Sequence, residues 1–260
     1  MRLETSVVVA HAEGAAGYRI LELRSPAIAA AVQPGQFVHL QVPGLEDTAL
    51  RRPFSVFRAA GERFSVLYKT VGRGTAALAR VAPGQELSVL GPLGNGFPLD
   101  PRGAQPVLVA GGYGVAPLCF LAARLPMRGT AFVGGASRPD LLCLEDFAAA
   151  GWTTHCATED GSAGARGLVT AALDEWLAAG PHTPPPVFYV CGPDGLLKAV
   201  GERAIAGGWR AWLSLDRHLG CGVGACLACV QRVRRPDGST GWARVCRDGP
   251  VFEAREIVWP

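Results

Sequence analysis

Most of the chain shows one of two patterns of hydrophobic and polar positions, and each pattern covers its own segment. Up to about residue 100, short alternating or β-branched runs are separated by Gly and Pro, which is typical of an all-β domain. The runs expected to be strands lie at 5–11, 18–24, 36–42, 52–59, 63–71 and 86–94, and a short helix is expected at 74–81. We therefore expect a six-stranded antiparallel β-barrel over residues 1–101.

A different rhythm begins at about residue 104. Continuous apolar runs alternate with amphipathic stretches, which indicates βαβ units and a doubly wound parallel sheet over residues 102–212. The expected strands lie at 106–112, 129–136, 152–160 and 187–193, and the expected helices at 116–125, 140–151, 168–180 and 195–208.

The remaining segment, residues 213–260, is short, rich in Gly and Arg, and carries four of the eight cysteines. It has too little apolar mass to fold alone, so we expect bound metal to supply what its core lacks. The predicted fold class is thus β plus α/β, with a small C-terminal metal domain.

Composition and charge narrow the function classes. The chain is 49% hydrophobic and 18% charged, which excludes a disordered protein. Its net charge of +3 comes from scattered basic residues, so nucleic acid is not expected as the main partner. No apolar run approaches the ~20 residues of a membrane span. We expect a cytoplasmic protein whose cysteines stay reduced, so that clustered cysteines indicate metal.

The cysteine spacing is the most specific motif. The spacing C-x4-C-x2-C-x16-C joins Cys221, Cys226, Cys229 and Cys246. Four thiolates suit Zn²⁺ or an iron–sulfur cluster, and structural zinc usually takes two tight pairs. Only one tight pair is present here, and the spacing matches the plant-type [2Fe–2S] pattern. Zinc and free thiols stay open as alternatives.

Two motifs in the β segment suggest a phosphate-bearing flat cofactor. In "RRPFS", Arg52 could pair with a phosphate while Phe54 and Ser55 face a ring system, although a surface Arg pair beside a core Phe is an alternative. Downstream, Gly72, Gly74 and Thr75 lie at the start of the expected helix, where backbone amides can bind pyrophosphate. A plain turn is the competing interpretation.

Two strand ends in the α/β segment carry nucleotide-type signals. Gly111, Gly112 and Gly114 follow the first apolar run, although they do not form a full G-x-G-x-x-G. Cys191-Gly192-Pro193 repeats the arrangement after the last run. Two such ends in one parallel sheet predict a binding crevice, whereas each alone could be a tight turn.

An acidic pair follows the run at 152–160. Glu159 or Asp160 could hold a ribose 2′-hydroxyl and would repel a 2′-phosphate, which favours NADH over NADPH. A solvated loop carboxylate is the alternative interpretation.

Together, "RPFS", "GRGT", "GPLGNGF", "GGYGVAP", "CGP" and "CGVGACLAC…VCRDGPVF" resemble, in this order, the electron-transfer subunits of type B dihydroorotate dehydrogenases, within the ferredoxin–NAD(P) reductase superfamily. The resemblance spans essentially the whole chain. It implies an FAD-binding barrel, an NAD-binding α/β domain and a [2Fe–2S] domain. It also implies an FMN-containing catalytic partner that oxidises dihydroorotate in pyrimidine biosynthesis, in a heterotetramer of two plus two subunits.

The resemblance assigns site residues motif by motif. It places FAD on Arg52, Pro53, Phe54, Ser55, Tyr68, Lys69, Thr70, Gly74 and Thr75, with Arg52 on the pyrophosphate. It places NAD on Gly111, Gly112, Gly114, Cys191, Gly192 and Pro193, and the cluster on Cys221, Cys226, Cys229 and Cys246. The chain departs from the family pattern at Leu196, where Met is common, and at His218-Leu219, where the family has Arg-Met.

The expected function follows from electron counting. NADH gives up two electrons as hydride, an iron–sulfur cluster takes one, and a flavin can do both, so the flavin belongs between them. The sequence contains no Ser-His-Asp, paired-carboxylate or nucleophile-elbow pattern, so no catalytic side chain is expected. Electrons from dihydroorotate would pass from FMN to the cluster, to FAD and to NAD⁺, and only with the partner present. A subunit of a hydrogenase, sulfide or ferredoxin oxidoreductase complex is the alternative, and a zinc-stabilised binding module is the alternative of another class.

Overall fold

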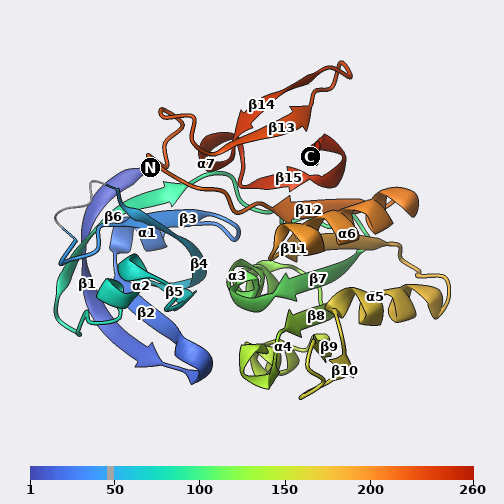
Figure 1. The fold of residues 1–260 in the computed structure, drawn as a ribbon, viewed down its shortest axis with the longest axis horizontal. Coiled ribbons are helices and arrows are strands. Elements are labelled where there is room, and N and C mark those ends of the chain that lie inside the picture. Colours follow the sequence, from blue (N-terminus) through green and yellow to red (C-terminus); the bar gives the residue numbers. More distant parts are fainter. Residues whose placement is uncertain (46–49) are drawn as a thin grey trace.

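The N-terminal alternating runs close into an antiparallel barrel in the computed structural model, which describes residues 1–45 and 50–260 (Figure 1). The strand order around the barrel is β1-β2-β5-β4-β3-β6. The strands are β1 (Arg2–Glu13), β2 (Tyr18–Arg24), β3 (Phe37–Leu40), β4 (Arg52–Ala60), β5 (Arg63–Lys69) and β6 (Glu86–Leu93). The predicted six-stranded barrel is confirmed.

Alternation along β3 explains how the barrel meets the rest of the chain. Val38 and Leu40 belong to the apolar core inside the barrel. Phe37 points the other way and joins a second apolar cluster with Cys229 and Cys246 of the C-terminal segment. The outer face of β3 is therefore covered by that segment.

The short helices of this half are α1 (Pro26–Ala29) and α2 (Arg73–Leu78), with a 3-10 turn η1 (Ala15–Gly17). The helix predicted at 74–81 is thus present, but it begins one residue earlier and ends three residues earlier. Helix α1 had no counterpart in the predicted elements.

The continuous apolar runs form a sheet with the order β10-β9-β8-β7-β11-β12-β15. The first six strands in this order are parallel and β15 pairs with β12 in the antiparallel sense. Their bounds are β7 (Gln105–Gly111), β8 (Thr130–Gly135), β9 (Thr153–Thr158), β10 (Ala165–Arg166), β11 (Pro186–Cys191), β12 (Arg210–Ser214) and β15 (Val251–Glu253). The predicted doubly wound parallel sheet is confirmed.

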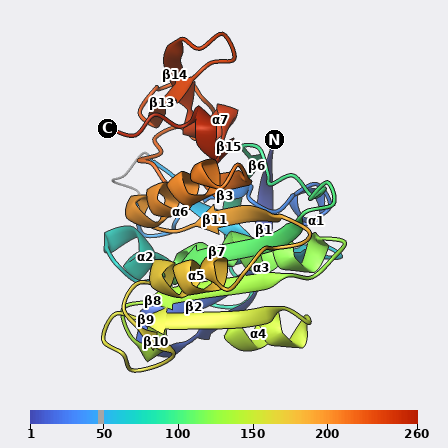
Figure 2. The ribbon, with the colours of Figure 1, turned by 90° about the vertical axis from the view of Figure 1, so that its right-hand side faces the viewer.

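Helices cover this sheet on both faces (Figures 1 and 2). They are α3 (Val115–Arg124), α4 (Leu144–Ala149), α5 (Val169–Ala178) and α6 (Asp194–Ala206), with 3-10 turns η2 (Gly112–Gly114) and η3 (Arg138–Asp140). Helix α3 packs against β7, β11 and also barrel strand β4, so it lies between the sheet and the barrel. None of the described helices is long and apolar enough to cross a membrane.

The strand order reverses between β7 and β11. The chain steps outward from β7 to β8 and β9, and then returns past β7 to β11 and β12. In open α/β sheets ligands bind at the carboxyl ends of the strands that flank such a reversal. The glycine motif after β7 and the Cys-Gly-Pro motif after β11 both lie there.

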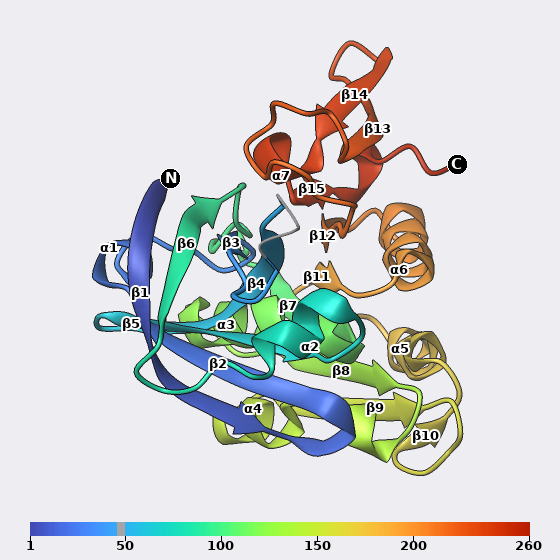
Figure 3. The same cartoon turned by 60° about the vertical axis from the view of Figure 1, so that its left-hand side comes forward.

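The C-terminal segment adds a hairpin above the sheet (Figure 3). It comprises β13 (Val230–Arg234), β14 (Thr240–Arg244), α7 (Val245–Asp248) and the 3-10 turn η4 (Ala254–Glu256), besides β15. Because β15 extends the parallel sheet and β12 spans residue 213, the predicted boundary at 212/213 divides a strand. The three-domain division stays a prediction.

Candidate functional site

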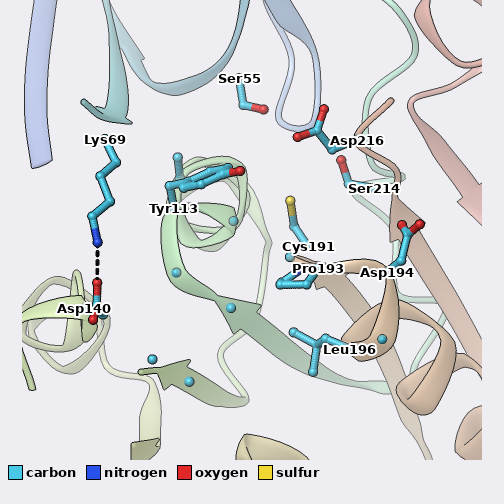
Figure 4. A pocket seen from close by; sticks show the side chains of 18 of the residues that line it. Ser55, Lys69, Tyr113, Asp140, Cys191, Pro193, Asp194, Leu196, Ser214 and Asp216 are labelled. Atoms are coloured by element: carbon cyan, nitrogen blue, oxygen red, sulfur yellow. Dashed lines mark hydrogen bonds and ion pairs between the residues drawn. The ribbon is translucent and has the colours of Figure 1, made fainter. Parts of the chain in front are cut away.

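A cavity of about 1070 Å³ lies where the barrel, the carboxyl ends of the parallel strands and the C-terminal segment meet (Figure 4). Barrel strands β3, β4 and β5 form one wall, and the ends of β7, β8, β11 and β12 form the other. Leu219, Val245 and Pro250 of the C-terminal segment also line it. Its volume suits a large cofactor with a second nucleotide beside it.

Most of the residues predicted to hold FAD line this cavity. Those that do are Pro53, Phe54, Ser55, Tyr68, Lys69 and Thr75, whereas Arg52, Thr70 and Gly74 lie outside the lining. The rings of Phe54 and Tyr68 meet edge to face with centroids 5.6 Å apart. The barrel therefore presents an aromatic wall with a hydroxyl group, at Ser55, beside it.

Tyr68 is held by a partly buried chain of hydrogen bonds. Its hydroxyl donates to Nε2 of His11 at 2.9 Å, because Nδ1 of His11 is 2.7 Å from the carbonyl oxygen of Val81 and must carry the proton. Burial raises the pKa of Tyr68 to about 12. The phenol stays protonated and fixes the ring in the cavity wall.

The two arginines of "RRPFS" have different surroundings. Arg51 donates to the backbone oxygen of Ser88 at 2.7 Å and to its hydroxyl at 2.9 Å, so it ties the start of β4 to β6 across β3. The side chain of Arg52 crosses the α-carbon of Gly74, where an added Cβ would lie 2.8 Å from Nε. A glycine is needed at 74 for Arg52 to take this position.

Thr75 caps its own loop. Its Oγ1 accepts the backbone N–H of Val71 at 2.9 Å and of Gly72 at 3.1 Å. This arrangement closes the turn that begins α2 beside the cavity.

The nucleotide-side residues meet at the strand reversal, and all six predicted ones line the cavity. An added Cβ on Gly114 would collide with the carbonyl oxygen of Cys191, and one on Gly111 would lie 2.9 Å from Cδ of Pro193. The glycines therefore let the ends of β7 and β11 approach each other. The predicted crevice exists, although these glycines are also required by packing alone.

A polar wall that the sequence analysis missed continues from Cys191 (Figure 4). Ser214 and Asp216, at and after the end of β12, line the cavity beside it. Burial raises the pKa of Cys191 to about 12, against a hydrogen bond from Ser214, so the thiol is neutral at pH 7. Burial also raises the pKa of Asp216, and nearby Arg217 opposes that shift. These two residues were missed because β12 itself was not predicted.

An ion pair bridges the two walls of the cavity. Nζ of Lys69 lies 2.9 Å from Oδ1 of Asp140, which also accepts the hydroxyl of Tyr18 at 3.0 Å. The hydrogen bond from Lys69 holds the pKa of Asp140 below its ordinary value. Ser137 and Asp140 form a capping box at η3, and this S-x-x-D pattern was the available signal.

The acidic pair after β9 separates into two roles. Glu159 lines the cavity and is exposed to it. Asp160 accepts the backbone N–H of Ser162 at 2.9 Å and its hydroxyl at 2.6 Å, so it holds a turn. Of the two, only Glu159 is in the cavity lining.

The four C-terminal cysteines lie as two pairs. The N–H of Cys221 is 3.4 Å from Sγ of Cys226, and the N–H of Cys246 is 3.4 Å from Sγ of Cys229. Two cysteine pairs are the ligand arrangement that a cluster with two irons takes.

The loop backbone is shaped to stabilise thiolate sulfur. The N–H groups of Ala225 and Cys226 lie 3.2 and 3.4 Å from Sγ of Cys221. Burial raises the pKa of this thiol, but the backbone N–H groups outweigh it and bring the pKa to about 6. Gly222 and Gly224 have φ of +71° and +85°, a conformation that favours glycine. The donor set thus fits an electron-rich sulfur cluster.

The departures from the family pattern, at Leu196 and at His218-Leu219, do not disturb the cavity or the cysteine loop. Leu196 and Leu219 line the cavity as apolar residues. His218 is exposed beside the cysteine loop and does not line the cavity.

Comparisons with known proteins agree with this arrangement. A family model described as the iron-sulfur cluster binding domain of dihydroorotate dehydrogenase B matches residues 216–258. The dihydroorotate dehydrogenase B (NAD(+)) electron transfer subunit of Bacillus caldolyticus is 44% identical and the match covers 87% of each chain. The subunit of the same name from Geobacillus sp. (strain WCH70) is 39% identical and the match covers 99% of each chain.

Solved structures share the architecture. An NADH-dependent reduced ferredoxin-NADP oxidoreductase, described in connection with flavin-based electron bifurcation, superposes with a TM-score of 0.85 at 27% identity, covering 98% of this chain and 90% of the other. A ferredoxin NADP⁺ reductase from Neisseria gonorrhoeae with bound FAD and NADP has the same fold, with a TM-score of 0.63 at 16% identity over 80% of this chain and 92% of the other. The chain belongs to the family of dihydroorotate dehydrogenase B (NAD(+)) electron transfer subunits.

Proposed function

We propose that this protein carries electrons between an FMN-containing dihydroorotate dehydrogenase subunit and NAD, by way of a [2Fe–2S] cluster and FAD, in pyrimidine biosynthesis. The observation that carries the proposal is that one cavity is lined by the barrel, the strand reversal and the cysteine-bearing segment. Sites for three redox groups therefore adjoin within a single chain. The names of the relatives supply the identity of the reaction.

FAD, when bound, supplies both hydride exchange with NAD and one-electron exchange with the cluster. The barrel residues hold and shield it: Phe54 and Tyr68 form an apolar wall, and Ser55 offers a hydroxyl group. Arg52 and Gly74, outside the cavity lining, are proposed to bind its phosphates. Thr70 is assigned to the FAD site by the family resemblance alone.

The strand reversal is proposed to bind NAD. Gly111, Gly112 and Gly114 leave backbone room on one side, and Cys191, Gly192 and Pro193 close the other side. Because the Cys191 thiol is neutral at pH 7, it adds no charge repulsion toward a transferring hydride. Glu159 is proposed to accept a ribose hydroxyl, which favours NADH over NADPH.

Cys221, Cys226, Cys229 and Cys246 are the proposed cluster ligands. Cys229 and Cys246 are each 2% exposed, whereas Cys226 is on the surface. The site therefore has one pair toward the molecular interior, where the cavity lies, and one cysteine toward the outside. A relay between an internal cofactor and an external partner needs this arrangement.

The partner is proposed to dock around the exposed end of the cysteine loop. Leu227 is 60% exposed and Trp242 is 68% exposed, and both belong to the C-terminal segment. Large exposed apolar side chains are common at the centres of protein interfaces. The two-plus-two assembly and the cytoplasmic location are parts of the same proposal.

The test begins with anaerobic purification, followed by iron, acid-labile sulfide and flavin analysis and by visible spectra before and after NADH. The proposal expects about two irons, two sulfides and one FAD, with bleaching by NADH. The holoprotein is then mixed with an FMN dihydroorotate dehydrogenase, and dihydroorotate-dependent NAD⁺ reduction is expected only from the mixture.

Two cysteine variants test the assignment of the cluster ligands. Cys226→Ser is expected to remove dihydroorotate-dependent NAD⁺ reduction, whereas Cys156→Ser, outside the proposed ligand set, is expected to keep it. Zinc in place of iron, or holoprotein without flavin, would show that the proposal is wrong. Efficient coupling to a hydrogenase, sulfide or ferredoxin partner instead would support the alternative complex.

A further inference from the structure

The motif "GPLGNGF" at 91–97 forms a close contact between the barrel and the stretch of chain that follows α7. It includes the end of β6 and a turn through Gly94 and Asn95. Gly94 has φ of +72°, and an added Cβ there would lie 2.6 Å from Cδ of Pro250 and 2.7 Å from the carbonyl oxygen of Gly249. Only glycine lets the barrel and the C-terminal segment approach this closely.

The side-chain amide of Asn95 binds the carboxyl end of α7. Its Nδ2 donates to the carbonyl oxygen of Arg247 at 3.1 Å and to that of Asp248 at 3.0 Å. Both partners can only accept hydrogen bonds, so the atom that faces them is the amide nitrogen. The last carbonyl groups of a helix have no partner within the helix. Asn95 supplies this partner from a distant part of the chain.

The backbone around Asn95 strengthens the contact. The N–H of Asn95 donates to the carbonyl oxygen of Gly249 at 2.6 Å, and Asn95 forms an isolated parallel bridge with Pro250. On the barrel side, the side-chain amide of Gln36 donates to the carbonyl oxygen of Gly94 at 2.7 Å. Residues 247–250 are thus clamped to a turn that the barrel itself holds.

The clamped stretch joins a proposed cluster ligand to the wall of the cavity. Cys246 lies in α7, one residue before the stretch begins. Pro250, at its other end, lines the cavity. On the barrel side, Leu93 of β6 pairs with Phe37 of β3, which also lines the cavity. The position of Cys246 relative to the cavity therefore depends on how residues 247–250 are held.

We propose that Asn95 is a positioning residue for electron transfer: its side-chain amide holds α7 against the barrel and so fixes the separation between the flavin and the cluster on Cys246. This inference rests on the proposed function, because it needs both redox groups. Asn95 does not line the cavity, so it acts through α7 alone. Misplacing held reactants by about 1 Å can slow their reaction by up to about a hundredfold.

Three variants separate the hydrogen bonds from the shape of the side chain. Asn95→Asp keeps the shape but turns a carboxylate oxygen toward the two carbonyl oxygens, so the end of α7 should move away. Asn95→Ala removes the donor without adding charge, and Asn95→Gln keeps it. Asn95 is exposed, so each variant should fold.

Gln85→Glu is the matched control for the change from amide to carboxylate. Gln85 is exposed just before the first residue of β6, whereas Asn95 follows the last one. Oε1 of Gln85 accepts the N–H of Ala82 at 2.8 Å, and a carboxylate oxygen can accept the same bond. This variant adds the same charge to the barrel without touching α7.

The first measurement compares the separation of flavin and cluster in the loaded proteins. Each protein is partly reduced with NADH until both groups carry an unpaired electron, and electron paramagnetic resonance records the splitting from their magnetic interaction. This splitting falls steeply as the separation grows. We expect a smaller or broadened splitting in Asn95→Asp and the wild-type splitting in Asn95→Gln and Gln85→Glu. A wild-type splitting in Asn95→Asp would overturn the inference.

The second measurement is the rate of electron transfer from flavin to cluster after laser-flash reduction of the flavin. The rate is expected to fall about tenfold in Asn95→Asp and to stay within about twofold of the wild type in Asn95→Gln and Gln85→Glu. Asn95→Ala should slow the transfer in the same direction, so slowing confined to Asn95→Asp would indicate an effect of charge and contradict a positioning role.

Reduction of the flavin by NADH is followed in the same samples. It should be unchanged in every variant, because Asn95 lies outside the cavity lining. Equal slowing of flavin reduction and of electron transfer would indicate a general disturbance of the fold and would also contradict the inference. If Asn95→Asp loses its cluster, Asn95→Ala takes its place in both measurements.

The outcomes separate this inference from the function on which it rests. Asn95→Asp that retains iron, sulfide and flavin and transfers electrons at the wild-type rate would leave the relay intact and reduce Asn95 to a surface contact. Wild-type protein without a cluster or without flavin would overturn the proposed function itself, and this inference with it.

Discussion

Asp140 concentrates three interactions on one carboxylate at the cavity edge. Lys69 and Tyr18 reach it from the barrel, and Ser137 donates to its other oxygen at 3.0 Å. Hydrogen bonds to a charged group contribute about 1.5–3 kcal/mol each when sheltered, and less where solvent screens them. This carboxylate therefore joins the barrel to the α/β half with an energy that depends on its ionisation.

Asp140→Asn is expected to lower the free energy of unfolding by about 1–2 kcal/mol at pH 7. Because the pKa of Asp140 is held below its ordinary value in the folded protein, the carboxylate contributes stability above its unfolded pKa near 3.9. That contribution is lost as the pH falls through the lower folded value. The measurement is denaturant unfolding of both proteins from pH 7 to pH 3.

The two stability curves should therefore begin to converge below about pH 4 and continue to do so as the pH falls toward the folded pKa. Glu62→Gln serves as the control, since Glu62 is exposed and its side chain makes no hydrogen bond or ion pair with the described residues. A gap between Asp140→Asn and wild type that stays constant with pH would show that the loss arises from packing rather than from ionisation.

Glu159 and Asp160 offer a matched pair for coenzyme choice. Glu159→Gln removes the charge at the cavity and is expected to improve the ratio of NADPH to NADH use by about tenfold, equivalent to 1.4 kcal/mol. Asp160→Asn, which alters the turn at Ser162, should leave that ratio within about twofold. Steady-state kcat/KM with both coenzymes measures it, and equal effects of the two variants would show that Glu159 does not face the ribose.

At the scale of elements, the meeting of β7 and β11 is the most constrained contact. Gly114→Ala is expected to lower the free energy of unfolding by about 1–3 kcal/mol, because its Cβ collides with the backbone of Cys191. The same shift should weaken NADH binding by moving the two strand ends apart. Denaturant unfolding and an NADH titration measure the two effects.

Gly195→Ala provides the comparison on the same side of the cavity. Gly195 is the second residue of α6, and an added Cβ there meets no atom within 4 Å. Alanine is the better helix former by up to about 1 kcal/mol, so this variant should be as stable as the wild type or slightly more so. If Gly114→Ala matched it in stability, the strand ends would have more freedom than the structure indicates.

Local patterns made most of these elements predictable, and long-range pairing explains those that were not. The barrel strands and the apolar strands β7, β8 and β11 are visible as period-two or continuous apolar runs. Strand β12 follows a Gly-Gly turn at the end of α6 and is only five residues long, so no period stands out. Strand β15 has three residues and exists because β12 offers an edge.

The same reason limits what the sequence could reveal about the site. Motif residues such as Ser55 and Cys191 could be predicted because their neighbours in sequence form a recognisable pattern. Asp140 and Tyr18 depend on contacts with other segments of the chain; the S-x-x-D pattern indicates the turn at Asp140 but not its partners Lys69 and Tyr18. Their roles become visible only when the walls of the cavity are assembled.

At the scale of the whole molecule, the C-terminal segment packs one side against the barrel and exposes the other side to solvent. Its buried residues Cys229, Val245 and Cys246 share an apolar cluster with Phe37 and Leu93 of the barrel. Because that packing fixes the segment, its outer face is a preformed surface rather than a flexible tail. A partner that binds there meets the exposed end of the cysteine loop without any rearrangement of the flavin site.

Trp242 offers the sharpest test of this surface. Trp242→Glu is expected to weaken binding of the catalytic subunit by at least about thirtyfold, because a central aromatic residue at an interface contributes about 2 kcal/mol or more. The side chain is 68% exposed, so its loss should leave folding unchanged. NADH-dependent reduction of a soluble one-electron dye should stay within about twofold of the wild type, while dihydroorotate-dependent NAD⁺ reduction falls.

Leu3→Glu is the matched control, because Leu3 is 66% exposed on barrel strand β1, outside the C-terminal segment. Added charge on any exposed apolar residue changes solubility and nonspecific association alike in both variants. Only a docking role makes Trp242→Glu selective for the reaction that needs the partner. Equal loss of coupling in both variants, or none in Trp242→Glu, would move the interface away from the cysteine loop and require electrons to leave the protein by another face.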